Sequence, residues 1–338
     1  MQTLIVGVGA LGGLIGARLR ATGARVWFAT RDEASASRLR ASGLRVSGVG
    51  GAADVAAPDV AALDAYPAGL GFDLVLLATK AHEAMELAPR IARWIEPGGT
   101  LVPIQNGAVS QLLADRLGHE RVLGGLSNLG ATMHAPGVFE QKNAGHLLIG
   151  ELGDGQSPRA ERVRAWLGQG VEVRVTPNLH GAIWSKLLLN CSVTTIGAIA
   201  GCTMRAYVGT PEGRVVFDRA YDEALSVAGA SGARPERMMV EPIPPGWSGR
   251  AVPSPEHEAW LAEVLRGYGD LKPSMLQDFE RGRTTEVDFI NGYVADLGRT
   301  LGIATPVNAA IVETVHRITR GDLRPDRSNL VAIAATAR

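Results

Sequence analysis

The feature that most constrains the fold is a glycine-rich turn close to the N-terminus. Residues 3–8 (Thr-Leu-Ile-Val-Gly-Val) form a short run, rich in β-branched residues, that is typical of a buried parallel strand. The pattern Gly7-x-Gly9-x-x-Gly12 follows directly, and residues 11–22 have the character of a helix. A strand, this glycine spacing and a helix in succession predict the first βα unit of a doubly wound sheet.

Each glycine of this turn has its own physical task. Gly7 permits the tight turn, Gly9 lets the backbone approach a pyrophosphate, and Gly12 lets the helix pack closely on the strand. The phosphates then lie at a helix N-terminus, where free N–H groups and the helix dipole favour negative charge. The residues expected to bind a dinucleotide cofactor are Gly7, Gly9, Ala10, Leu11 and Gly12.

The end of the second strand, residues 25–29, indicates which dinucleotide binds. NAD-binding chains usually hold the ribose 2′-hydroxyl with a carboxylate at this strand end. Here Thr30 and Arg31 occupy the position, and arginine can hold a 2′-phosphate through several donors. We therefore predict NADP(H) rather than NAD(H). Asp32 has two open roles, since it could cap the next helix or hold the ribose.

Strands and helices alternate through the first half of the chain, which predicts a parallel sheet covered on both faces. Three further strand-like runs are assigned to the far side of the same sheet: Gly137–Gln141, His146–Ile149 and Val171–Val175. The segment 48–70 has no clear pattern. The remaining predicted elements are helices over about 33–41, 82–95 and 109–117, and strands over 44–47, 73–79 and 100–105.

The character of the sequence changes near Pro177, and almost everything beyond it looks helical. We therefore predict an α/β domain over residues 1–176 and an all-α domain over 177–338. The proline-rich segment Glu241–Pro255 looks like a long loop. The predicted helices of the second domain run over about 179–201, 211–230, 256–267, 273–281, 285–301 and 305–319.

The composition argues against several classes of protein. The 34 Lys and Arg balance the 34 Asp and Glu, so the chain lacks the basic footprint of a nucleic-acid binder. Cys191 and Cys202 lie among apolar or small neighbours, which favours small buried side chains over a disulfide framework or a metal site. No export signal is visible, and the longest apolar stretches are strand-length. We expect a cytoplasmic protein that binds neither nucleic acid, membrane nor metal; a homodimer is compatible with the sequence.

One line of polar residues runs along an otherwise apolar helix. Lys186, Asn190 and Thr194 are four residues apart, so they lie on one stripe of the segment 181–195. Because lysine is rarely buried without a partner, the stripe either lines a cleft or is a snorkelling lysine with hydrogen-bonded neighbours at an interdomain surface. An ammonium beside a ketone would stabilise the charge that hydride addition builds on oxygen, and could donate the proton. Partial burial would lower the lysine pKa toward a working value.

A second polar segment covers residues 272–288. Residues 285–288 (Thr-Glu-Val-Asp) are similar to a capping box that opens the next helix. Glu286 would then lie in the first helical turn, where the dipole favours its ionised form. The alternatives are that Glu286 only complements this dipole and that Ser274 is an ordinary helix-start serine.

These motifs together resemble ketopantoate reductase, in the order of that family and over nearly the whole chain. The resemblance implies a Rossmann domain, then a helical domain of the 6-phosphogluconate dehydrogenase C-terminal type, with the active site in the cleft between them. It implies NADPH-dependent reduction of 2-dehydropantoate to (R)-pantoate, in pantothenate and coenzyme A biosynthesis. The motifs that carry it are Gly7 to Gly12, Thr79-Lys80-Ala81, Gln105-Asn106-Gly107, Trp184-x-Lys186-x-x-x-Asn190, Ser274-Met275-Leu276-Gln277-Asp278 and Thr285-Glu286-x-Asp288-x-Ile290-Asn291-Gly292.

The resemblance also assigns roles in the second domain. Lys186 would be the general acid that protonates the nascent alkoxide, and Glu286 would bind and orient the polar groups of the substrate. Asn190 would hydrogen-bond the substrate, and Ser274 would hold its carboxylate.

In the first domain, the resemblance places Lys80 near cofactor and substrate. It gives Asn106 a hydrogen bond to substrate beside the cofactor. The position of Asn106 in the sequence predicts the same ligand-binding site, because Asn106 follows a strand at the carboxyl edge where α/β folds bind ligands.

The chain departs from the family pattern at Thr194, where the ketopantoate enzymes typically carry a second asparagine. A threonine hydroxyl lacks the paired groups and the reach of an amide, and losing a polar contact can reshape specificity. We therefore keep two alternatives: a reductase of a different 2-oxo acid in which Thr194 contacts the substrate, and a degenerate NADPH-binding regulatory protein.

Overall fold

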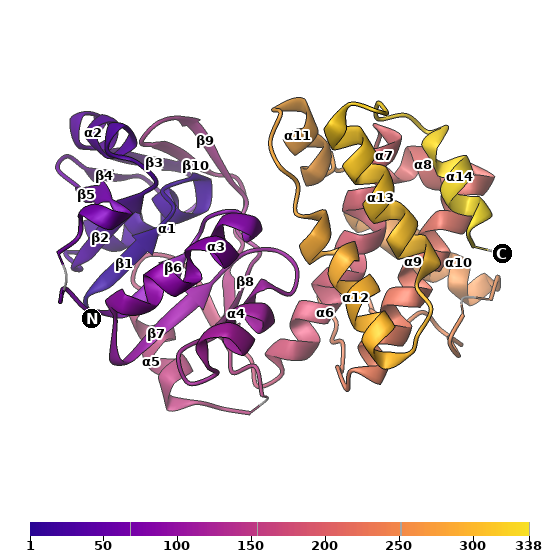
Figure 1. The fold of residues 1–338 in the computed structure, drawn as a ribbon, viewed down its shortest axis with the longest axis horizontal. Coiled ribbons are helices and arrows are strands. Elements are labelled where there is room, and N and C mark those ends of the chain that lie inside the picture. Colours follow the sequence, from indigo (N-terminus) through magenta and orange to yellow (C-terminus); the bar gives the residue numbers. More distant parts are fainter. Residues whose placement is uncertain (68, 154, 251, 338) are drawn as a thin grey trace. The chain divides into compact units, whose positions relative to one another are not determined.

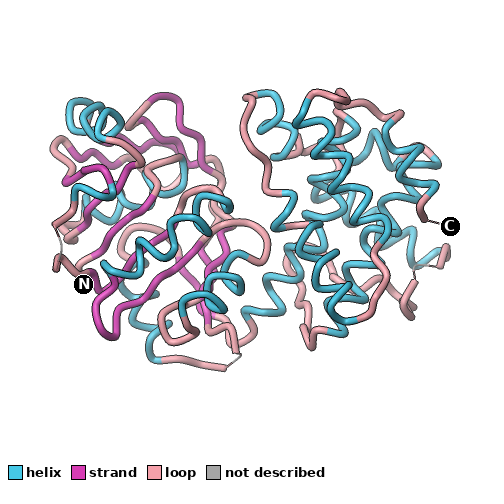
Figure 2. Tube along the Cα trace, viewed as in Figure 1, coloured by secondary structure: helices cyan, strands magenta, loops and turns pink. Residues whose placement is uncertain are grey.

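The computed structural model describes residues 1–338 except Ala68, Asp154, Ala251 and Arg338. It divides into two compact units, Met1–Leu179 and His180–Arg338. All strands of the described residues belong to the first unit, and the second is helical (Figures 1 and 2). The predicted fold class, an α/β domain followed by an all-α domain, is confirmed.

The first unit is built on a five-stranded parallel sheet in the order β5-β2-β1-β6-β7. Central strand β1 is wholly buried, as its β-branched sequence predicts. The chain runs outward from β1 to one edge and then returns to pair β6 on the other side of β1. The strand order therefore reverses between β1 and β6, which is where doubly wound sheets bind ligands. The strands are β1 (Thr3–Val6), β2 (Val26–Thr30), β5 (Asp59–Ala62), β6 (Phe72–Leu77) and β7 (Ile95–Pro103).

Helix α1 (Ala10–Ala21) is enclosed between this sheet and a second one. A Cβ at Gly16 would lie 2.3 Å from Phe28 of β2, and a Cβ at Gly13 would lie 2.1 Å from Phe139 of β10 (Val138–Gln141). Glycine is therefore needed on both faces of α1 for the layers to meet. Further helices of this unit are α2 (Glu33–Ser42), α3 (Ala81–Ile91), α4 (Val109–Leu117) and α5 (Pro158–Leu167).

The strands expected on the far side of the main sheet belong to two smaller sheets. β8 (Gly124–Ser127), β11 (Leu147–Gly150) and β12 (Val173–Val175) form one, joined to β7 by an isolated parallel bridge between Leu101 and Val122. The assignment of Gly137–Gln141 to the main sheet is wrong. β10 pairs with β3 (Leu44–Gly48) and β9 (Ala131–Ala135), and β4 (Ala53–Val55) completes that sheet. The physical reason is Phe139, which packs on α1 rather than beside β7.

Several element boundaries also differ from the prediction. Strand β7 begins at Ile95, so Pro97-Gly98-Gly99 is an irregularity within the strand rather than a stop before it. The segment 48–70, which had no clear pattern, contributes β4 and β5. Helix α5 was not predicted from the sequence, although Ser157 caps it and Pro158 opens it.

The second unit is a set of helices packed around one apolar core. Ser and Thr caps followed by proline set several helix starts, for example Thr210-Pro211 and Ser254-Pro255. The expected loop 241–255 carries no helix or strand over residues 241–250 and 252–254. The helices are α6 (Leu179–Leu189), α7 (Thr195–Ala200), α8 (Met204–Val208), α9 (Pro211–Ala230), α10 (Pro255–Tyr268), α11 (Ser274–Glu280), α12 (Asn291–Leu301), α13 (Pro306–Arg320) and α14 (Asn329–Ala335).

The stretch Leu179–Ala200 is the central element of this unit. Among the described residues, it is the one helix long and apolar enough to cross a membrane, with mean hydropathy 1.3 over 18 residues. The expectation that the longest apolar stretches are strand-length is therefore wrong. Because 83% of that window is buried, the stretch is a core helix of the folded chain.

Candidate functional site

The glycine turn after β1 is closed on its protein side and open on the other. Gly7 has φ +94°, and a Cβ there would lie 2.7 Å from Thr79 Cγ2. A Cβ at Gly12 would lie 2.1 Å from the Gly7 carbonyl oxygen, whereas a Cβ at Gly9 would meet no described atom within 4 Å. Gly9 also precedes α1 without a side chain to cap its N-terminal N–H groups. The turn therefore fits a pyrophosphate, which needs close approach to the backbone at Gly9.

The carboxyl ends of β6 and β7 are tied together beside this turn. Gln105 Nε2 donates to the carbonyls of Leu77 (3.0 Å) and Thr79 (3.1 Å). Lys80 lies three residues after the end of β6 and Asn106 three residues after the end of β7, and both are half-buried. The glycine turn, Lys80 and Asn106 therefore lie at one edge of the sheet, where the parallel strands end.

Gln105 had no predicted role, although the sequence shows a polar residue at the end of a buried strand. Its side chain is only 7% exposed, and its Oε1 is buried with no hydrogen-bond partner in the described structure. Both partners of Nε2 are carbonyl oxygens, so the amide orientation is fixed. Gln105 therefore links the carboxyl ends of β6 and β7 through Nε2, and its Oε1 remains as a buried acceptor.

Asp32, just after β2, has one of its two predicted roles in the structure: it caps the next helix. One carboxylate oxygen accepts from the Ser35 N–H (2.7 Å) and caps α2; the other pairs with Arg31 Nε (3.0 Å). The hydrogen bonds from Ser35 hold the pKa of Asp32 below its usual range. Arg31 has a side chain that is 82% exposed, so its guanidinium can reach a ligand at the end of β2.

In the second unit, the polar stripe is confirmed. Lys186, Asn190 and Thr194 are half-buried, and the other positions between 181 and 200 are buried. Burial lowers the pKa of Lys186 to about 8, and the charge of Glu286 opposes that shift. Glu286 is itself only 8% exposed. The structure therefore brings the two predicted catalytic side chains together within one unit.

The helix that carries the stripe is interrupted, contrary to the prediction of one helix over 179–201. Residues Asn190–Thr194 form a π turn, in which the Thr195 N–H bonds to the Asn190 carbonyl five residues back. In a continuous α-helix, two steps of four residues would rotate Thr194 by about 80° from Lys186. A π turn has more residues per turn and offsets this drift. The interruption therefore keeps the three polar side chains in line.

The start of α11 lies at the far end of this stripe. A Cβ at Gly197, one turn after Thr194, would lie 2.6 Å from Pro273 Cγ. Glycine at 197 thus allows α11 to approach, and Ser274 is its first residue and exposed. The structure therefore gathers Lys186, Asn190, Thr194, Ser274 and Glu286 in the second unit.

The predicted capping box at 285–288 is wrong. Glu286 precedes a short 3-10 turn, Val287–Phe289, without a side-chain cap, and α12 begins only at Asn291. The Asp288 carboxylate instead accepts a hydrogen bond from His316 Nε2 of α13 (2.9 Å). A long-range hydrogen bond therefore takes the place of the predicted local cap.

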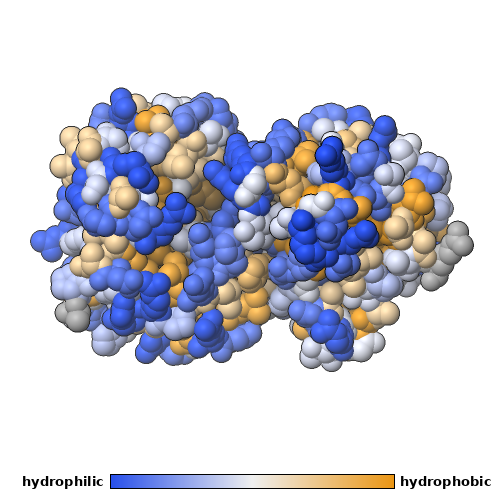
Figure 3. All heavy atoms as spheres, turned by 45° about the horizontal axis from the view of Figure 1, so that its top comes forward, coloured by the Kyte–Doolittle hydropathy of each residue, from blue (hydrophilic) through white to orange (hydrophobic). Residues whose placement is uncertain are grey.

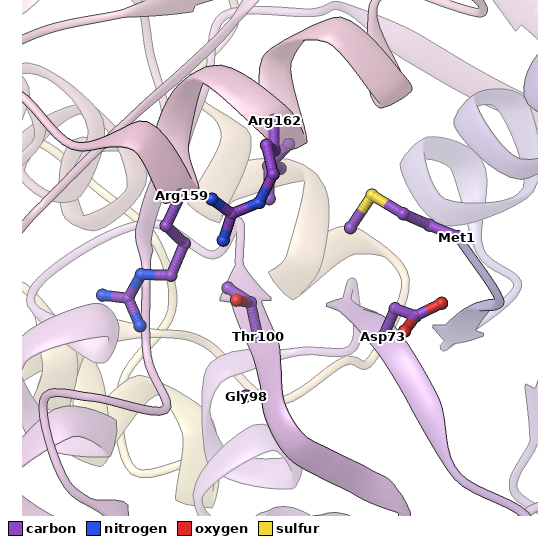
Figure 4. Close-up of a pocket in the computed structure, with 7 residues that line it drawn as sticks. Met1, Asp73, Gly98, Thr100, Arg159 and Arg162 are labelled. Carbon is purple, nitrogen blue, oxygen red and sulfur yellow. The ribbon is translucent and has the colours of Figure 1, made fainter.

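A small pocket lies away from these residues. It has a volume of about 150 Å³ and is lined by Met1, Asp73, Thr100, Arg159 and Arg162, among others (Figure 4). Met1 precedes β1 and Asp73 is near the start of β6, so the pocket is at the amino-terminal edge of the sheet. It is therefore separate from the glycine turn.

Known proteins resemble the chain over most of its length. A family model described as Ketopantoate reductase PanE/ApbA matches residues 3–154, and one described as Ketopantoate reductase PanE/ApbA C terminal matches residues 178–319. The chain belongs to the ketopantoate reductase family. The resemblance drawn from the sequence motifs is thus confirmed.

Relatives of the ketopantoate reductase family support oxidoreductase activity on CH–OH groups. The uncharacterized oxidoreductase YkpB of Bacillus subtilis (strain 168) is 27% identical over 322 residues, covering 94% of this chain and 97% of YkpB. The 2-dehydropantoate 2-reductase of Archaeoglobus fulgidus is 27% identical over 325 residues, again covering 94% and 97%. This chain is accordingly an oxidoreductase with a nicotinamide cofactor.

A solved structure outside the pantoate enzymes has the same fold. The ternary structure of D-mandelate dehydrogenase with NADH and anilino(oxo)acetate has a TM-score of 0.78 at 22% identity. The alignment covers 95% of this chain and 99% of the dehydrogenase. At this identity the likeness shows the shared fold alone.

Proposed function

We propose that the protein reduces 2-dehydropantoate to (R)-pantoate with NADPH, as a step toward pantothenate and coenzyme A. The observation that carries the proposal is Lys186, whose pKa is lowered to about 8, beside Glu286 and in line with Asn190. A lysine with this pKa is mostly protonated at neutral pH and is a better acid than an ordinary lysine.

The proposed mechanism divides the work between side chains. NADPH supplies a hydride when bound. The Lys186 ammonium stabilises the charge that develops on the substrate oxygen and then donates its proton there. Glu286 orients the substrate hydroxyl and keeps Lys186 cationic. Asn106, Asn190 and Thr194 hydrogen-bond the substrate.

The remaining site residues hold the two ligands. Ser274 binds the substrate carboxylate. The glycine turn cradles the pyrophosphate, Arg31 pairs with the 2′-phosphate, and Lys80 lies beside the cofactor. The preference for NADPH rests on Arg31, and on Asp32 serving as a helix cap instead of a ribose ligand.

The deciding experiment is steady-state oxidation of NADPH, and separately NADH, with 2-dehydropantoate. We expect kcat/KM of about 10⁴ M⁻¹s⁻¹ or better, with NADPH preferred. NADPH binding without turnover of 2-dehydropantoate would contradict the proposed substrate and leave the fold and the cofactor unaffected.

A different 2-oxo acid is the second candidate, and Thr194 is the observation that favours it. Because D-mandelate dehydrogenase shares the fold, the substrate panel should include an aryl 2-oxo acid besides aliphatic ones. A regulatory protein would bind NADPH in a titration and turn over none of the panel.

We further propose that the enzyme acts in the cytoplasm on this small 2-oxo acid, without nucleic-acid or membrane partners, and as a homodimer. Light scattering of the purified protein tests the homodimer, since a monomer mass of 35.5 kDa would contradict it.

A further inference from the structure

A chain of buried polar side chains lies behind the π turn. Asn291 of α12 and Asn308 of α13 are 0% exposed, and both are part of hydrogen bonds that link different helices. Glu223 of α9 completes the chain. Buried polar groups are costly unless they are paired, so two fully buried asparagines joined to a half-buried carboxylate call for a functional explanation.

Hydrogen bonds link α9 to the site helix through α13 and α12. Glu223 accepts from the backbone N–H groups of Val307 and Asn308, both at 2.9 Å, and thereby caps α13. Asn308 Nδ2 donates to Glu223 Oε2 (2.8 Å), and Asn308 Oδ1 accepts from Asn291 Nδ2 (2.9 Å). Asn291 Nδ2 also donates to the carbonyl of Cys191 (3.1 Å), which lies in the π turn.

The π turn takes donors from outside its own backbone. The Cys191 carbonyl accepts from the Thr195 hydroxyl (2.5 Å) as well as from Asn291. The neighbouring Ser192 carbonyl accepts from the Tyr207 hydroxyl (2.6 Å). Because a π turn is rare and departs from the regular i→i−4 bonding, such side-chain donors stabilise it against a return to α-helix.

We propose that Asn291, held by Asn308 and Glu223, is a positioning residue that fixes the π turn and so keeps Thr194 in line with Lys186 and Asn190. The inference rests on the proposed function, in which Asn190 and Thr194 contact the 2-oxo acid. Without the π turn, Thr194 would rotate away from Lys186 by the helical drift described above. The hydrogen-bonded side chains of Glu223, Asn308 and Asn291 therefore control binding of the 2-oxo acid without contacting it.

The test replaces Asn291 and compares it with a matched asparagine. Asn291→Ala should raise KM for 2-dehydropantoate about tenfold, because the loss of a buried donor releases the turn, and should leave the Kd of NADPH unchanged. Asn329→Ala is the control, since Asn329 Nδ2 donates to the Ile199 carbonyl beyond the π turn (3.3 Å). The control should leave KM within about twofold of the wild-type value.

A double variant separates positioning from general destabilisation. If Asn291 acts through Thr194, Asn291→Ala should raise KM much less in a Thr194→Ala background than in the wild type. Equal effects in both backgrounds, or no effect of Asn291→Ala in the wild type, would overturn the proposal. Should Asn291→Ala not fold, Tyr207→Phe makes the same comparison by removing the donor to Ser192.

Hydrogen exchange of the holoenzyme tests the stability of the π turn independently of substrate turnover. The Thr195 N–H should exchange faster in Asn291→Ala than in the wild type, while the amides of the parallel sheet keep their wild-type rates. In Asn329→Ala, the Thr195 N–H should also exchange at the wild-type rate. If the wild type reduces none of the 2-oxo acids, the proposed function fails and the exchange result still decides about the turn. Unchanged exchange at Thr195 would refute the role of Asn291.

Discussion

At the scale of single residues, Lys186 is the side chain with the clearest chemical signature. Its lowered pKa means that it loses its proton near pH 8, far below an ordinary lysine. Because reduction needs the protonated form, kcat/KM for reduction should fall as pH rises through about 8, and oxidation of the alcohol should show the opposite trend. The pH dependence of both directions measures this.

Removing the ammonium provides the control for that profile. Lys186→Ala should lower kcat about 10²- to 10⁴-fold and abolish the descending limb. If the fall of kcat/KM with rising pH persists in Lys186→Ala, the ionisation that causes it belongs to another group.

Arg31 should decide between the two cofactors. Its side chain is largely exposed and pairs with Asp32 through Nε, so its guanidinium is available to a 2′-phosphate. Arg31→Ala should weaken NADPH binding at least about tenfold and leave NADH binding nearly unchanged, because only NADPH carries the phosphate. Fluorescence titration with both cofactors measures the difference; equal weakening would mean that Arg31 acts through the structure of α2.

Sequence periodicity was sufficient to find the polar stripe, because residues four apart lie on one face of a helix even with the drift of a regular α-helix. It could not find the π turn, since that depends on donors from Asn291 and Tyr207, which are distant in the chain. The role of Asp32 likewise needed coordinates, because both of its alternatives fit the same position in the sequence.

At the scale of elements, local signals predicted the first βα unit and most helices of the second unit. Caps and prolines at helix starts are local, as at Thr210-Pro211. The pairing of β10 with β3 is not local, and the packing of Phe139 on Gly13 that explains it has no signature in either segment alone. Long-range packing therefore accounts for the misplaced strand.

The glycine turn offers a prediction at this scale, since two of its glycines are restricted by different neighbours. Gly12→Ala would bring a Cβ within 2.1 Å of the Gly7 carbonyl oxygen and should destabilise the fold by about 1–3 kcal/mol or more. Gly9→Ala meets no described atom within 4 Å and should keep the stability of the wild type, yet weaken NADPH binding at least about tenfold. Gly229→Ala, also without a neighbour within 4 Å, is the control that should change neither quantity much. Thermal melts and NADPH titrations of the three variants separate the two effects, and an unchanged Kd in Gly9→Ala would place the pyrophosphate elsewhere.

At the scale of the whole molecule, the two compact units carry different parts of the chemistry. The glycine turn proposed to bind the cofactor belongs to Met1–Leu179, and Lys186, the proposed proton donor, belongs with its polar stripe to His180–Arg338. Each unit has its own apolar core, as expected of domains that could fold separately. Hydrophilic side chains cover most of the face of each unit seen in Figure 3, with smaller apolar patches between them.

This division predicts how ligands stabilise variants. NADPH at about 100 times its Kd should stabilise the wild type by about 2.7 kcal/mol, because it binds only the folded state. Lys186→Ala should retain that full shift in Tm, since its substitution lies in the other unit, whereas Gly9→Ala at the same NADPH concentration should lose most of it. Differential scanning fluorimetry with and without NADPH measures both variants in one experiment. If Lys186→Ala loses the shift as well, Lys186 contributes to cofactor binding, and its role is not confined to the proton transfer.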